Sequence, residues 1–83
     1  MDSCLITFRS VTPAQRAENI LRQGGILCAI QRTPKQLADQ GCGYSVRVPY
    51  RQLQTAAELL RQKGIGYRKT YCLKNDIPEE VIL

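Results

Sequence analysis

A short pattern that occurs twice constrains the fold of this 83-residue chain more than any other feature. Residues 21–26 read LRQGGI, and residues 60–65 read LRQKGI. Each copy closes a segment with helical apolar spacing, and the glycine stands where a helix commonly ends. A strand-like run precedes each helix and another follows it. The chain therefore predicts a strand–helix–strand unit, repeated once.

The predicted strands are residues 4–8, 26–30, 44–48 and 67–73. Thr12-Pro13 predicts the start of the first helix, with Thr12 as N-cap, and Pro49 predicts the start of the second. Two such units in succession predict an α+β fold, the ferredoxin-like β-α-β-β-α-β two-layer sandwich. In that fold a four-stranded antiparallel sheet carries two helices on one face. We expect one domain over residues 1–74 and a C-terminal tail over residues 75–83.

Composition and charge indicate a globular domain and do not favour a membrane protein or a strongly basic nucleic-acid-binding surface. Hydrophobic residues make up 43% of the chain, which is typical of a globular domain. The net charge of +5 comes from scattered Lys and Arg, which favours an ordinary solvated surface. Glu18 and Arg22 suit an i,i+4 ion pair on an exposed helix face. No signal segment or membrane-length apolar run is visible, so we expect a cytoplasmic protein with reduced cysteines.

The chain has no histidine, which excludes Ser-His and Cys-His catalysis within it and the usual zinc spacings. We expect neither an enzyme nor a metal site. Cys4 and Cys72 fall in strands that should be antiparallel neighbours, so they could lie close together. We interpret both as small apolar strand residues. Cys28, between Ile26 and Ile30, is interpreted as a core residue.

Cys42 is the candidate reactive thiol, because it stands between two glycines in the loop of residues 33–43. A single helical turn is predicted over residues 34–39, with Leu37 packed on the body. A thiolate without histidine could carry sulfur or selenium, for example as a persulfide, or could sense oxidation. The alternative is that Gly-Cys-Gly is only a tight turn. The candidate binding residues around Cys42 are Arg32, Thr33, Lys35, Gly41, Gly43 and Arg47.

From residue 5 to about residue 71 the sequence resembles the Se/S carrier protein-like family. The resemblance rests on LITF at residues 5–8, TPKQL at 33–37, Cys42-Gly43 and the strand arginine Arg47. Lys35 stands where the family has arginine, and residues 38–41 replace its usual serine pair. Some members of the family are joined to a TusA-type sulfur-carrier domain. The resemblance implies chalcogen carriage on Cys42 without a cofactor, and a partner protein that delivers sulfur or selenium.

Two binding functions are alternatives. The chain could be a non-catalytic interaction module that forms a homodimer through an edge strand or through residues 77–83. It could also bind RNA on the open sheet face, but Val46-Arg47-Val48 offers no stacking ring, so nucleic acid is the less favoured partner. No membrane partner is expected.

Overall fold

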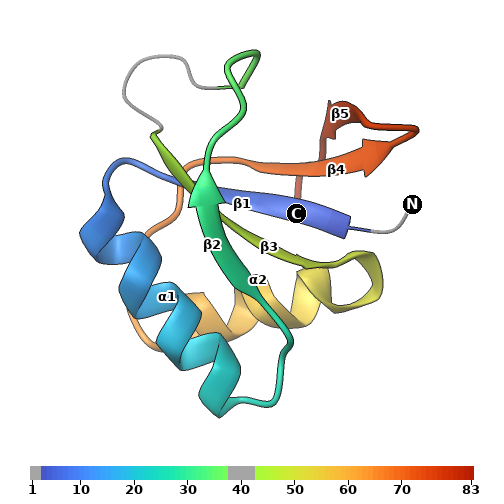
Figure 1. Ribbon diagram of the computed structural model, residues 1–83. Helices are drawn as coiled ribbons and strands as arrows, with labels where there is room; N and C mark the ends of the chain where they lie inside the picture. Colours follow the sequence, from blue (N-terminus) through green and yellow to red (C-terminus); the bar gives the residue numbers. More distant parts are fainter. Residues whose placement is uncertain (1–2, 38–42) are drawn as a thin grey trace.

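A computed structural model describes residues 3–37 and 43–83. It contains one antiparallel sheet of five strands, in the order β2-β3-β1-β4-β5, and two α-helices. Figure 1 shows both helices on the same side of the sheet. The elements are β1 (Ser3–Phe8), α1 (Val11–Gln23), β2 (Ala29–Arg32), β3 (Tyr44–Pro49), a 3-10 turn (Tyr50–Gln52), α2 (Leu53–Gln62), β4 (Thr70–Lys74) and β5 (Ile77–Glu80).

The core lies between the sheet and the helices. Side chains alternate across a strand, so Cys4, Ile6 and Phe8 of β1 share a face and are fully buried. Tyr44, Val46 and Val48 of β3 lie opposite residues on this face, as the sequence predicts. The helices contribute their apolar stripes to the same cluster: Ala14, Ala17 and Leu21 from α1, and Leu53, Ala56 and Leu60 from α2. The α+β class is therefore confirmed.

The repeated pattern folds the same way in both copies. Gly25 and Gly64 have φ of 82° and 74°, the left-handed conformation in which glycine has no Cβ clash. The next N–H in each copy reaches back to the helix, from Ile26 to the Leu21 carbonyl and from Ile65 to the Leu60 carbonyl, each at 2.9 Å. These bonds define a Schellman helix end. The prediction that a glycine marks the end of each helix is confirmed in both copies.

The prediction of four strands is wrong, because residues assigned to the tail form a fifth. Asn75 and Asp76, with φ of 52° and 63°, make the two-residue turn of a hairpin between β4 and β5. Two successive residues with positive φ are typical of a type I′ turn, which matches the twist of the flanking strands. Asn and Asp tolerate this conformation better than most residues, so the pair Asn75-Asp76 is the feature of the sequence that indicates a hairpin here.

Several element boundaries also differ from prediction. Strand β4 begins at Thr70 rather than at residue 67, and the 3-10 turn separates Pro49 from the start of α2 at Leu53. Helix α1 begins at Val11 after Ser10, so Thr12 is not its N-cap. Strand β2 begins at Ala29 rather than at Ile26. Ile26 is buried against the core instead of pairing in the sheet, because the Schellman bond holds its N–H on α1. None of the described helices is long and apolar enough to cross a membrane.

Cys4 and Cys72 form a disulfide, which corrects the expectation that both are reduced. The register of β1 and β4 places them directly opposite each other, and both are fully buried. Their proximity followed from the predicted topology. The bond itself did not, since apolar strand residues and disulfide partners leave the same pattern in a sequence. Cys28 is free and buried, as predicted.

Candidate functional site

The predicted site lies at the end of the sheet where the chain leaves β2 and returns in β3 (Figure 1). Cys42 and Gly41, the predicted thiol and one of its glycines, lie outside the described residues. The other predicted residues are described, and Gly43 directly follows Cys42. The described part of the site is therefore the two segments on either side of residues 38–42. We name residues 32–37 the first arm, and the segment that begins at Gly43 and continues into β3 the second arm.

Thr33 joins the two arms. Its N–H donates to the Gly43 carbonyl at 3.1 Å, which extends the β2–β3 ladder by one pair. Its hydroxyl lies 2.7 Å from the Ser45 hydroxyl, and the two side chains are only 7% and 0% exposed. On the first arm, the Leu37 N–H donates to the Pro34 carbonyl at 2.8 Å and closes a turn over residues 34–37. The described part of the predicted helical turn is thus a single closed turn.

A third buried hydroxyl continues this polar row across the sheet. Thr7 of β1 lies opposite Ser45. Its hydroxyl donates to the Lys69 carbonyl at 3.1 Å and accepts from the Lys69 N–H at 3.0 Å. The Arg68 N–H also donates to the Thr7 carbonyl, so two residues before β4 face one residue of β1, as in a β-bulge. Sequence reasoning missed Ser45 and Thr7, although both are polar residues within apolar strands.

The three predicted basic residues are not gathered around one point. Arg32 pairs with Tyr44 and its guanidinium lies 5.8 Å from the centre of that ring, a cation–π distance. Arg47 lies on the opposite face of the sheet, where its Nε donates to Gln31 at 3.1 Å. Lys35 is exposed in the turn. Of the three, Arg47 shares the sheet face of Thr33 and Ser45, because all three occupy alternate positions of the same kind.

Topology adds two exposed arginines that the sequence did not assign to the site. Arg9 follows Phe8, whose partner in β3 is Tyr44. Arg68 lies next to the bulge opposite Thr7. With Arg32, three arginines from three segments therefore lie at one end of the sheet. Positive charge at this end favours anions, an effect that bulk ions screen over about 10 Å at 0.1 M salt.

Cys28 lies elsewhere in the structure, beneath α1. Its thiol donates to the Glu18 carbonyl at 3.5 Å, and the residue is 7% exposed. Burial raises the pKa of the Cys28 thiol, an effect that the neighbouring Arg22 partly offsets and the Glu18 charge reinforces. A raised pKa leaves little thiolate at neutral pH, so Cys28 is a poor nucleophile.

Replacing Thr33 with valine should destabilise the protein by about 1–3 kcal/mol, because the buried Ser45 hydroxyl loses its partner. Urea unfolding followed by circular dichroism measures the effect. Adding Ser45→Ala should cost less than the sum of the single changes, since the two hydroxyls share one bond. Thr12→Val in the exposed first turn of α1 is the matched control. Equal losses in Thr33→Val and Thr12→Val would contradict the assigned bond.

Comparison with known proteins shows a family match over most of the chain. The model of a family described as "Putative Se/S carrier protein-like" matches residues 3–72 of the chain. The matched segment begins with β1 and ends within β4, so it includes the loop and both arms. No curated protein and no solved structure matches the chain.

Proposed function

Because the chain belongs to the Se/S carrier protein-like family, we propose that it carries a sulfur or selenium atom on Cys42. The family match includes Cys42 together with the Thr33–Leu37 segment that precedes it. The carried atom would be bound as a persulfide or its selenium analogue. The chain would hand this atom on to a partner and perform no further chemistry on it, so we propose a carrier and not an enzyme.

The observation that carries this proposal is the state of the other cysteines. The chain has four. Cys4 and Cys72 are bonded to each other, and Cys28 is buried beneath α1 with a raised pKa. A carrier needs a thiol that can meet a donor and ionise. None of the three described cysteines meets both needs, which supports the remaining cysteine of the chain, Cys42, as the carrier residue.

The loading step balances without an oxidant. The Cys42 thiolate attacks the outer sulfur of a donor persulfide, R–S–SH. A new bond forms between the Cys42 sulfur and that outer atom, the donor S–S bond breaks, and the donor leaves as the thiolate R–S⁻. The outer atom keeps its proton until it ionises. With R–S–SeH as donor, the same step transfers selenium. Unloading is the reverse reaction with an acceptor thiol.

The described neighbours support this chemistry from the two arms. Thr33 holds the arms at one bonded pair, so the loop begins and ends at a fixed place. Exposed Arg32 and Lys35 on the first arm, with Arg9 and Arg68 at the same end of the sheet, favour an anionic cargo and an acidic docking face. We propose that the partner is a protein that delivers sulfur or selenium. The cytoplasmic location stays a prediction.

Replacing Cys42 with alanine should abolish loading. The probe is glutathione persulfide, and intact-protein mass spectrometry reads the gain of one sulfur atom without reductant. Peptide mapping after alkylation places that atom. Cys28→Ala is the matched control, since it removes the free thiol found among the described cysteines and should leave loading unchanged. Far-UV circular dichroism should show the same fold in both variants.

The opposite result would locate the chemistry elsewhere. If Cys42→Ala still gained sulfur while Cys28→Ala did not, the buried thiol would be the acceptor and the proposal would fail. If neither variant nor the wild type gained sulfur from the persulfide, carriage by a free thiol of this chain would be refuted.

A further inference from the structure

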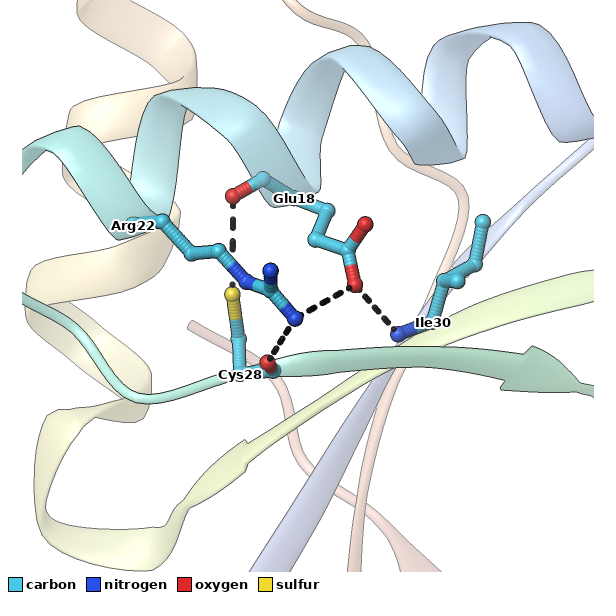
Figure 2. A network of polar contacts seen from close by, with 4 residues as sticks. All are labelled: Glu18, Arg22, Cys28 and Ile30. Atoms are coloured by element: carbon cyan, nitrogen blue, oxygen red, sulfur yellow. Dashed lines mark hydrogen bonds and ion pairs between the residues drawn. The ribbon is translucent and has the colours of Figure 1, made fainter.

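The outer edge of β2 is covered by two side chains from α1. Figure 2 shows Glu18 and Arg22 reaching from the helix to the backbone of the strand. One Glu18 carboxylate oxygen accepts the Ile30 N–H at 3.0 Å. The Arg22 guanidinium donates to the Cys28 carbonyl at 3.4 Å and to that same Glu18 oxygen at 3.2 Å. We name Glu18 and Arg22 the edge clasp.

The direction of these backbone groups follows from the β2–β3 ladder. The Thr33 N–H points to Gly43 of the β3 arm. In an antiparallel strand the N–H and C=O of one residue point to the same side, and the side alternates along the strand. The backbone N–H and C=O groups of Ala29 and Gln31 therefore point toward β3. Those of Cys28, Ile30 and Arg32 point outward, away from the sheet. β2 is a terminal strand of the sheet, so these outward groups form its free edge.

The clasp acts at this edge as a neighbouring strand would. It offers an acceptor to the outward N–H of Ile30 and a donor to the outward carbonyl of Cys28, with its own charges balanced by an ion pair. The Glu18 side chain is 17% exposed, so its bond to Ile30 is shielded from water more than most surface contacts. An ordinary exposed i,i+4 pair would contact solvent and not the backbone of a strand.

Without the clasp, β2 could pair with β2 of a second copy. An antiparallel arrangement centred on Ile30 would place Cys28 opposite Arg32 and Ala29 opposite Gln31, with no like charges opposed. The central bonds of that arrangement need the Ile30 N–H, the group that Glu18 occupies. We propose that the edge clasp closes β2 to this pairing and so blocks dimerisation through that edge.

The other edge of the sheet has a different protection. The Val81 N–H donates to the Thr70 carbonyl across the β4–β5 ladder, so Pro78 faces outward. Proline has no N–H to offer a further strand, and prolines on edge strands commonly oppose such pairing. Residues 29–32 of β2 contain no proline, so this strand has no such protection of its own. The edge clasp protects the edge of β2 with two side chains from α1 instead.

The test compares Glu18→Ala with Glu58→Ala, which removes the same charge from an exposed position of α2. Sedimentation velocity over a concentration series measures the association state. Glu58→Ala should behave as wild type, and Glu18→Ala should show an additional concentration-dependent doubling of mass. Equal behaviour of the two variants would overturn the proposal.

A double variant separates strand pairing from general aggregation. Glu18→Ala with Ile30→Pro lacks the outward N–H that the pairing requires, and the β2–β3 bonds do not use this N–H. It should return to the association state of wild type. Continued association of the double variant would overturn the proposal. In the wild type, the Ile30 amide hydrogen should exchange more slowly than that of Arg32, and the reverse order would also overturn it.

Discussion

Replacing both Cys4 and Cys72 with alanine is expected to lower the free energy of unfolding by about 4 kcal/mol. The two residues are separated by 68 positions, so their bond closes a large loop of the unfolded chain and removes much of its entropy. For a domain of this size such a loss corresponds to roughly 20 °C in Tm. The loss of two buried sulfur atoms adds a smaller cavity term. Thermal unfolding without reductant measures the effect.

Dithiothreitol provides the internal control for this prediction. It should lower the Tm of the wild type toward that of the double variant and leave the double variant unchanged. Cys28→Ala keeps the bond and should respond to reductant as the wild type does. An unreduced wild type with the same Tm as the double variant would show that the bond contributes nothing to stability.

Replacing Phe8 with alanine should cost about 3–5 kcal/mol. Phe8 is the largest of the fully buried side chains in the described part of the chain. It is the last residue of β1 and lies opposite Tyr44. Its removal opens a cavity at the end of the core from which the loop leaves. Urea unfolding gives the loss of stability. Leu27→Ala is the control, because Leu27 is 81% exposed and should change stability by less than about 0.5 kcal/mol. Comparable losses in both variants would contradict the assigned core.

Local patterns were sufficient to predict much of the fold. The helix ends were predictable because each requires a residue in the left-handed conformation, which glycine adopts without a clash. Strand β3 was predictable because apolar residues alternate along a strand that buries one face. The hairpin after β4 was missed because Asn75-Asp76 was not recognised as a turn that favours positive φ. The start of β2 was displaced because the apolar character of Ile26 suits both a strand and a core contact.

The candidate site was less predictable, since its contacts join distant segments. Thr33 was identified from a motif, but its partner Ser45 becomes visible only when the two strands are in register. Glu18 and Arg22 were correctly paired along the helix, yet their contacts with β2 depend on how α1 packs over the strand. The Cys4–Cys72 bond depends on the same kind of register, across a separation that no local pattern spans.

The bond between Thr33 and Gly43 also bears on how such a chain could diversify. It fastens both ends of the loop to the sheet, so the register of β2 and β3 does not depend on what lies between them. Lengthening a closed loop adds little entropy cost, about 0.6 kcal/mol for each doubling. Insertions and substitutions in this segment would then be nearly neutral for folding, and selection could refit the loop to new donors while the scaffold stays unchanged.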